Sequence, residues 1–242
     1  MFKGIFTPAI TIFDEKGNID YDGNRRIIDR LVESGVDGIL FLGSIGEFFA
    51  LTFEEKKKLI SFAVRTVGGR VKALVGTGGT VVKEVTALTQ FAQGEGADAA
   101  VVISPYYMST DEDSLYRYYT EVAASVKMPV LLYNFPDRTA VDIPPRLVRR
   151  LAQEVPNIVG IKDTVDTISH TRKLVQAVRD LPKEFSVFSG FDEYLIPNLM
   201  AGGAGIIGGL TNIAPRLFVA LYRAFREGDL ARVRALEEKV CT

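Results

Sequence analysis

Eight apolar runs rich in β-branched residues recur along the chain, and each is followed by a segment with helical spacing. This alternation is typical of parallel sheets in which a helix connects each strand to the next. Because the runs are almost continuously apolar, we expect a sheet that is covered on both faces. The predicted strands cover residues 4–10, 36–42, 71–76, 98–103, 129–133, 157–162, 185–189 and 204–208.

Eight strand–helix units most simply close into a barrel, and such barrels typically take about 250 residues. The alternative is an open, doubly wound sheet. No linker-like or low-complexity segment divides the 242 residues. We therefore predict the α/β class: a (β/α)8 TIM barrel over residues 1–228, followed by the start of a C-terminal helical extension at 229–242.

The predicted helices include one strong start signal, a capping box formed by Thr52 and Glu55. The last helical segment, 230–241, carries an apolar stripe, and no further segment follows that could cover it. We expect that the C-terminal extension is short or missing, or that the stripe packs on another subunit. The stripe consists of Leu230, Val233, Leu236 and Val240.

Composition argues against several functions. The net charge is −1, from 29 basic and 30 acidic residues, which indicates neither a nucleic-acid footprint nor binding to an anionic membrane. We find no apolar run long enough to cross a membrane and no signal-peptide pattern at the N-terminus. One cysteine, Cys241, and one histidine argue against a disulfide framework and a zinc site. A cytoplasmic location is the simplest expectation.

The sixth predicted strand ends in a lysine, Lys162, at the end of the barrel where active sites lie. Burial favours the neutral amine, which can attack a carbonyl group. The alternative is a solvated lysine that merely ends the strand. Because side chains alternate along a strand, Gly160 shares the face of Lys162, and we expect that it leaves room for the lysine stem.

Tyr133 ends the neighbouring strand, so its phenol and the amine of Lys162 can converge in one mouth. An amine beside a proton-carrying phenol suits imine chemistry. The alternative for Tyr133 is an aromatic plug with its hydroxyl bonded to the backbone. Arg138 could pair with a substrate carboxylate or be solvated. His170, on a predicted helix, is expected to be structural or solvated.

Four motifs resemble, in order and spacing, the dihydrodipicolinate synthase / N-acetylneuraminate lyase superfamily of class I pyruvate-dependent aldolases. The resemblance runs from residue 4 to about 238 and implies a (β/α)8 barrel. It implies that Lys162 is the Schiff-base lysine and Tyr133 the proton-transfer phenol. It implies that the backbone amides of Ser44 and Ile45 bind the pyruvate carboxylate and that Ile207 lines the pyruvate site. The motifs are GSIGE at 43–47, PYY at 105–107, YNFP at 133–136 and GIKDT at 160–164.

Departures from the synthases bear on the substrate. Synthases usually carry threonine at the place of Ile45, in a proton relay with two tyrosines, the second of which reaches over from a neighbouring subunit. Ile45 breaks that relay, although Tyr107 remains. Asp192 and Glu193 resemble the acidic pair with which sugar-acid lyases hold acceptor hydroxyls, and residues 160–172 resemble the 2-keto-3-deoxy-sugar-acid aldolase branch. Against this, Arg138 matches the synthase residue that binds the semialdehyde carboxylate.

The leading hypothesis is an aldolase that cleaves or forms a 2-keto-3-deoxy sugar acid such as 2-keto-3-deoxygluconate, from pyruvate and an aldehyde. Ser44, Thr164, Asp192 and Glu193 would hold its carboxylate end and hydroxyls. The alternatives are a 4-hydroxy-tetrahydrodipicolinate synthase and a non-catalytic keto-acid-binding barrel. We expect no metal or organic cofactor, because the imine is the electron sink. Family members form dimers or tetramers, so a homo-oligomer is expected if the C-terminal helices are present.

Overall fold

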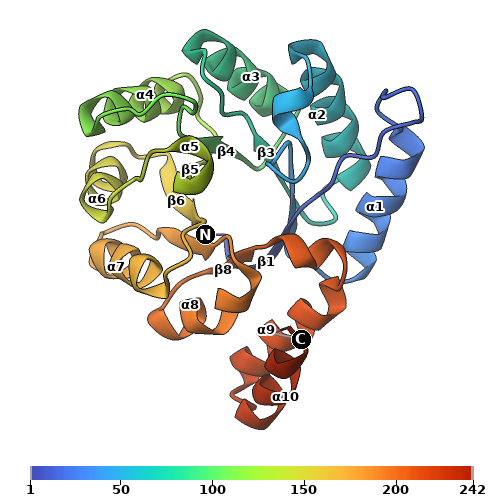
Figure 1. Cartoon of the computed structure of the whole chain (residues 1–242), viewed down its shortest axis with the longest axis vertical. Helices are drawn as coiled ribbons and strands as arrows, with labels where there is room; N and C mark the ends of the chain where they lie inside the picture. Colours follow the sequence, from blue (N-terminus) through green and yellow to red (C-terminus); the bar gives the residue numbers. More distant parts are fainter. Residues whose placement is uncertain (1, 241–242) are drawn as a thin grey trace.

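Eight parallel strands close into a barrel in the order β1 to β8, with β8 paired to β1. The computed structural model describes residues 2–240. Figure 1 shows the helices arranged around the strands. The closed barrel confirms the predicted fold and excludes the open sheet. The strands are β1 (Gly4–Pro8), β2 (Gly38–Phe41), β3 (Lys72–Gly76), β4 (Ala99–Ile103), β5 (Val130–Asn134), β6 (Ile158–Asp163), β7 (Ser186–Ser189) and β8 (Gly205–Ile207).

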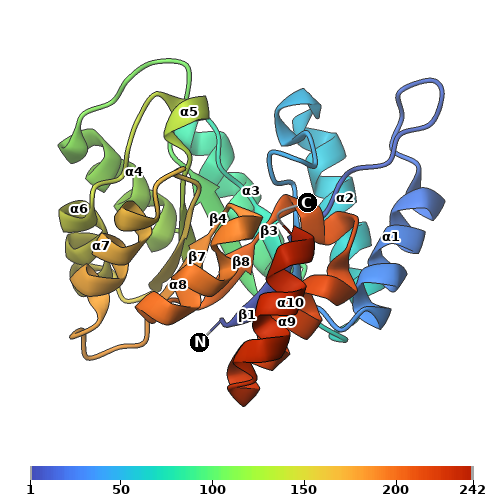
Figure 2. The same cartoon turned by 60° about the horizontal axis from the view of Figure 1, so that its bottom comes forward.

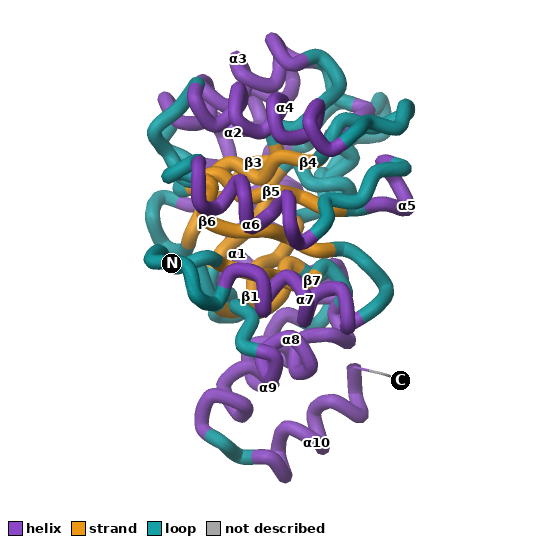
Figure 3. The backbone as a smooth tube through the Cα atoms, turned by 90° about the vertical axis from the view of Figure 1, so that its left-hand side faces the viewer, coloured by secondary structure: helices purple, strands orange, loops and turns teal. Residues whose placement is uncertain are grey.

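The strands are connected by helices of very different length. Figure 3 shows the short helix α5 beyond the strands, at the barrel end that carries the strand-to-helix loops. The α-helices are α1 (Tyr21–Glu33), α2 (Phe53–Val67), α3 (Val82–Gly94), α4 (Glu112–Ala124), α5 (Pro136–Thr139), α6 (Pro145–Glu154), α7 (Ile168–Val178), α8 (Leu195–Ala201), α9 (Pro215–Glu227) and α10 (Leu230–Val240). Three 3₁₀ turns are η1 (Phe48–Ala50), η2 (Asp192–Tyr194) and η3 (Gly209–Asn212).

The interior of the barrel is a packed core. Phe6 on β1 and Phe188 on β7 meet edge to face, with ring centroids 5.3 Å apart, and both are buried. On the next layer, Leu131 of β5 is fully buried. Burial of apolar groups on this scale supplies most of the driving force for folding. The open end of the barrel is therefore a rigid platform for the residues that end the strands.

The predicted capping box at the start of α2 is confirmed. The Thr52 hydroxyl accepts a hydrogen bond from the Glu55 backbone N–H at 3.3 Å, and the Glu55 carboxylate accepts one from the Thr52 N–H at 2.8 Å. Such caps stabilise a helix start by about 1 kcal/mol. Here the cap fixes where α2 begins after the β2 loop that carries Ser44.

The expectation that nothing in the chain covers the last apolar stripe is wrong. Helix α10 lies beside α9, as Figure 2 shows, and packs against it. Val233 is buried, and Leu236 and Val240 pack against the core that α9 helps to form, whereas Leu230 is 71% exposed. The tight turn at Gly228, with φ of +76°, reverses the chain between the two helices. Cys241, the cysteine considered above, lies outside the described residues, as does the end of the predicted extension 229–242.

Across residues 2–240, the structure contains no helix of the length and apolar character needed to cross a membrane.

Candidate active site

Lys162 and Tyr133 lie side by side at the carboxyl ends of β6 and β5. The two residues are direct partners in the register of these strands. Lys162 is only 4% exposed, and its Nζ lies 4.4 Å from the centroid of the Tyr133 ring. The predicted convergence of the amine and the phenol is therefore present, and the alternative of a solvated lysine is wrong. A buried amine over an aromatic face is held in place by packing and by cation–π attraction.

Gly160 lies two residues before Lys162, and the structure requires glycine there for a different reason from the one we expected. A Cβ there would lie 2.7 Å from the Ser186 carbonyl oxygen and 3.2 Å from Leu131 Cγ. Glycine thus allows close approach of the β7 backbone and of a side chain from β5. Neither of these nearest atoms belongs to Lys162, so the expectation of space for the lysine stem is replaced by one of tight strand packing.

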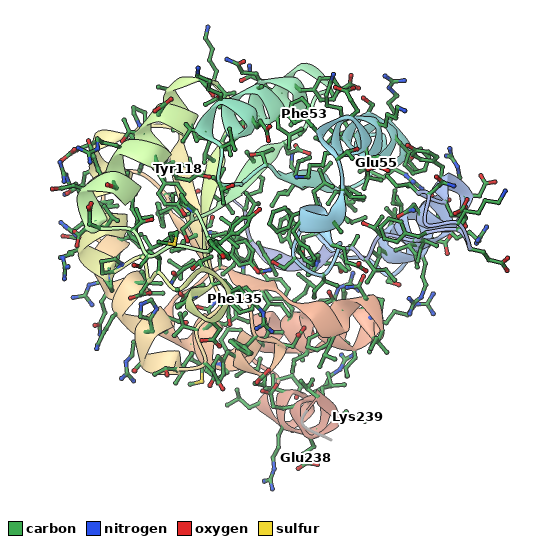
Figure 4. All side chains as sticks on the ribbon, turned by 45° about the horizontal axis from the view of Figure 1, so that its top comes forward. Phe53, Glu55, Tyr118, Phe135, Glu238 and Lys239 are labelled. Atoms are coloured by element: carbon green, nitrogen blue, oxygen red, sulfur yellow. The ribbon has the colours of Figure 1, made fainter. Side chains whose placement is uncertain are left out.

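The Tyr133 hydroxyl points toward the β2 side of the mouth, where it lies 3.3 Å from Ser44 Oγ. The ring is stacked on Phe135 with centroids 6.0 Å apart, and Figure 4 shows Phe135 near the centre of the barrel mouth. The hydroxyl partner is a side chain, not the backbone partner that the plug alternative supposed. A small cavity of about 10 Å³ between Tyr133, Ser44 and Phe48 has room for roughly one water molecule.

Asp192 is the second unusual ionisable group of the mouth. It is 8% exposed, and its Oδ2 accepts a hydrogen bond from the Leu210 N–H at 3.1 Å, while Oδ1 has no hydrogen-bond partner among residues 2–240. Burial raises the pKa of Asp192 to about 6, and the charge of Lys162 acts in the opposite direction. The Asp192 carboxyl and the Lys162 amine therefore interact electrostatically. A buried carboxyl with a free oxygen is suited to binding a hydroxyl group or a proton.

Thr164 lies two residues after Lys162 and is also buried, and its Oγ1 has no hydrogen-bond partner in the described part of the chain. A Cβ on Gly190 would lie 2.0 Å from that oxygen, so only glycine fits beside the threonine. Ile207, on β8, is fully buried and belongs to the hydrophobic core of the barrel.

The structure does not bring every predicted residue together. Glu193 is exposed, so the acidic pair is split between a buried and a solvated carboxylate. Arg138 is exposed and lies with its guanidinium carbon 5.6 Å from the Phe135 centroid. Tyr107 is 91% exposed and has a positive φ of 82°, which is uncommon for a residue with a side chain.

Ile45 is 42% exposed on the β2 loop. Its Cδ1 reaches across to the β8 side, where a Cβ on Gly209 would lie only 2.7 Å away. The isoleucine thus narrows the mouth with an apolar group at a position where a hydroxyl would extend the Ser44–Tyr133 contact. No cluster of three or more metal-ligating His, Cys, Asp or Glu side chains is present in the described part of the chain.

The comparisons with known proteins agree with this geometry. The model of the Dihydrodipicolinate synthetase family matches residues 1–242. YagE of Escherichia coli (strain K12), provisionally named a 2-dehydro-3-deoxy-D-gluconate aldolase, is 46% identical over 96% of this chain and 77% of its own length. YjhH of the same organism, described as a probable 2-dehydro-3-deoxy-D-pentonate aldolase, is 43% identical over 99% of this chain and 79% of its own.

The synthases are similar as well. The 4-hydroxy-tetrahydrodipicolinate synthase of Methanoculleus marisnigri is 42% identical over 98% of this chain and 80% of its own. The crystal structure of YagE in complex with pyruvate superposes with a TM-score of 0.98 at 44% identity, over 100% of this chain and 81% of that one. These matches confirm the prediction that the chain is an enzyme of the lysine-imine aldolase class, a carbon–carbon lyase. The chain belongs to the dihydrodipicolinate synthetase family.

Proposed function

We propose that this protein is a pyruvate-dependent aldolase that cleaves or forms a 2-keto-3-deoxy sugar acid through an imine on Lys162. The observation that carries the proposal is the buried Lys162 amine beside the Tyr133 phenol at the carboxyl end of the barrel. The names given to YagE and YjhH, both provisionally those of sugar-acid aldolases, support the substrate class. The pyruvate bound in the YagE crystal structure supports pyruvate as the shared component.

In the cleavage direction, Lys162 Nζ adds to the C2 ketone, and Tyr133 donates its phenol proton to the departing hydroxyl, which leaves as water. This step gives a protonated imine and a Tyr133 phenolate. Tyr133 takes the proton of the C4 hydroxyl while the C3–C4 bond breaks, and the electron pair of that bond moves into the imine to form an enamine. The aldehyde product departs. Protonation at C3 and hydrolysis then release pyruvate and the free amine. The imine supplies the electron sink, so we propose no metal or organic cofactor.

The neighbouring groups would position the substrate. The backbone amides at Ser44 and Ile45 would receive the carboxylate, because N–H groups near a helix start attract anions. The unpartnered oxygens of Thr164 and Asp192 would bind hydroxyls of the acceptor part. Glu193, which is exposed, would contact only the outer end of a longer substrate.

A second candidate is the condensation of pyruvate with aspartate semialdehyde. The similarity to the Methanoculleus marisnigri synthase and the presence of Arg138 favour it. Two observations speak against it: Ile45 offers no hydroxyl to the relay, and the buried carboxyl of Asp192 suits hydroxyls better than a second carboxylate. We therefore rank the sugar-acid reaction first. The non-catalytic barrel has no observation in its favour.

We further propose a cytoplasmic homo-oligomer. The low cysteine content supports the location. The oligomer is supported by large apolar side chains that are exposed after β2 and β4, because association would remove their apolar surface from water. They are Ile45, Phe49, Tyr107 and Met108.

Turnover with defined substrates tests the proposed reaction. The purified chain is incubated with the C4 epimers of 2-keto-3-deoxygluconate, and separately with pyruvate plus aspartate semialdehyde. We expect pyruvate release from one sugar acid, loss of that release in Lys162→Met, and retention in the control Lys173→Met, which alters an exposed lysine of α7. Turnover of the semialdehyde alone, or full activity of Lys162→Met, would contradict the proposal.

A further inference from the structure

A polar network lies on the outer side of β5 and β6, behind the reactive pair, and reaches from buried side chains to the exposed Asp142. It consists of Asn134, Asp142, Asp163, His170 and Thr171. Asn134 and Asp163 directly follow Tyr133 and Lys162 and are partners in the same strand register. Because side chains alternate along a strand, they point away from the barrel interior, toward α7.

The centre of this network is the carboxylate of Asp163, which is completely buried. It accepts hydrogen bonds from Asn134 Nδ2 at 3.0 Å, from Thr171 Oγ1 at 2.9 Å and from His170 Nδ1 at 3.0 Å. A buried carboxylate is tolerated only when its oxygens are satisfied and its charge is balanced. Of these three donors, only the histidine can carry a positive charge.

His170 bridges two carboxylates. Its Nδ1 faces Asp163, and its Nε2 lies 3.3 Å from Asp142 Oδ1, while its own side chain is 16% exposed. The Nδ1 contact is a hydrogen bond, whereas the contact between Nε2 and Asp142 Oδ1 is an ion pair without hydrogen-bond geometry. That ion pair attracts the imidazole only when the ring is protonated. Pairing with Asp142 and with Asp163 accordingly raises the pKa of His170 to about 10. The single histidine of the chain is therefore a fixed counter-charge at neutral pH.

The network sits where three strands end together. The Asn134 carbonyl accepts from the Thr164 N–H at 2.8 Å, and the Asp163 carbonyl accepts from the Gly190 N–H at 2.7 Å. The Asn134 side chain also binds Asp142 and the Ile143 N–H, at 2.8 and 3.0 Å. The two backbone bonds hold the chain within two residues of Lys162 and Tyr133. The two side-chain bonds of Asn134 hold the segment between α5 and α6, which follows β5.

We propose that His170 is a positioning residue for the imine reaction: its bridge between Asp142 and Asp163 holds the ends of β5 and β6 so that the amine and the phenol keep their mutual geometry. This inference rests on the proposed function. Without the imidazolium, the buried Asp163 charge is left with two neutral donors, and relief requires water entry or a shift of the strand ends. Displacements of about 1 Å near a reacting centre can lower rates roughly hundredfold.

The test measures the rate at which borohydride traps pyruvate on the intact protein, across a range of pyruvate concentrations. His170→Phe removes the donor to Asp163 and the charge that pairs with Asp142. We expect the limiting trapping rate to fall by about ten- to a hundredfold, with a smaller change in half-saturation. His170→Asn restores one donor to Asp163 and is expected to recover most of the rate. A structural role alone would not produce this rescue at equal thermal stability.

The matched control is Arg149→Gln, which breaks an ion pair of 2.6 Å between α6 and Asp180, beyond the far end of α7. This substitution removes a contact between α6 and the residue that follows α7, and it leaves the network intact. The trapping rate of Arg149→Gln should therefore equal that of the wild type. A folded His170→Phe protein that traps at the rate of the control would overturn the inference.

A further variant keeps the test decisive if His170→Phe does not fold. Thr171→Val removes one neutral donor to Asp163 without changing the shape of the side chain. A trapping rate several-fold below that of Arg149→Gln supports the positioning role, and an equal rate overturns it. Absence of any adduct in the wild-type protein would instead contradict the proposed function, so the two failures are distinguishable.

Discussion

Because His170 is ion-paired in the folded protein, we expect the stability of the fold to fall at alkaline pH. The charged side chains that pair with the imidazole are Asp142 and Asp163. The pKa of His170 rises from 6.5, the value of a free imidazole, to about 10 in the folded protein. A raised pKa means that the folded state binds the proton more tightly than the unfolded state. The stabilisation is therefore complete below about pH 6.5 and is lost as the pH rises through about 10.

The size of the effect follows from the pKa shift. Each unit corresponds to about 1.4 kcal/mol, so the full shift gives an upper limit of about 5 kcal/mol. Asp142 is 46% exposed, and solvent screens its part of the interaction. We therefore expect the free energy of unfolding to fall by about 2 to 3 kcal/mol between pH 7 and pH 10 because of this group.

Urea unfolding of the wild type and of His170→Asn, at pH 7, 8.5 and 10, isolates the contribution. Asparagine donates to Asp163 at every pH, so the variant lacks the titration. Other groups that titrate in this range are common to both proteins and cancel in the difference. We expect the stability difference between the two proteins to shrink as the pH rises. Parallel curves over the whole range would refute the assignment of a charged bridge.

Three further predictions concern the mouth of the barrel. Burial raises the pKa of Asp192 from 3.8 to about 6, so the destabilisation by its ionised form grows between these two pH values and is complete above about pH 6. Asp192→Asn should therefore raise the free energy of unfolding by about 2 kcal/mol at pH 8 and by less at pH 5, while aldol cleavage weakens. A less stable variant at pH 8 would contradict this. Tyr133→Phe should lower kcat by about 10²- to 10⁴-fold, while the variant still forms the pyruvate adduct. Steady-state rates equal to those of the wild type would exclude a proton-transfer role for Tyr133. Gly190→Ala should lower the melting temperature, because its Cβ would lie 2.0 Å from Thr164 Oγ1. The control is Gly94→Ala, since Gly94 also lacks a positive φ and has no atom within 4 Å of its Cβ. Calorimetry that finds Gly190→Ala as stable as the wild type would show that the Thr164 side chain moves aside at no cost.

The pairing of Lys162 with Tyr133 could be predicted from the sequence because it depends on short-range rules. Period-two alternation decides that Lys162 and Tyr133 face the interior, and the closure of eight strands makes their strands neighbours. Neither step needs the conformation of a loop. The predicted strand ends were less accurate. Strand β2 stops at Phe41, because Leu42 takes a positive φ of 55°, which no residue pattern predicts.

The fate of the acidic pair could not be predicted, because it is decided by a single turn. Asp192 and Glu193 are adjacent and chemically alike, yet the 3₁₀ turn η2 buries the first and exposes the second. The burial of Asp192 also requires a glycine from a distant strand end, since a Cβ on Gly208 would lie 2.2 Å from its Oδ1. Contacts of this kind exist only once β7 and β8 are paired.

The partners of His170, expected only to be structural or solvated, could not be predicted for a similar reason. One of its partners, Asp163, is seven residues away, but Asp142 is 28 residues away and belongs to the loop before α6. A carboxylate directly after a strand-end lysine, with a histidine at the start of the next helix, was a signal that could have indicated a buried pair. Only the fold shows that the second carboxylate completes the bridge.

The most direct test of the account identifies the residue that carries the imine. The wild-type protein is reduced with borohydride in the presence of pyruvate, digested and examined by peptide mass spectrometry, with Lys162→Met treated in parallel. We predict one reduced pyruvyl adduct, on the peptide that contains Lys162, and none in the variant. A folded wild-type protein without an adduct, or with its adduct on another lysine, would contradict the central claim that Lys162 is the nucleophile.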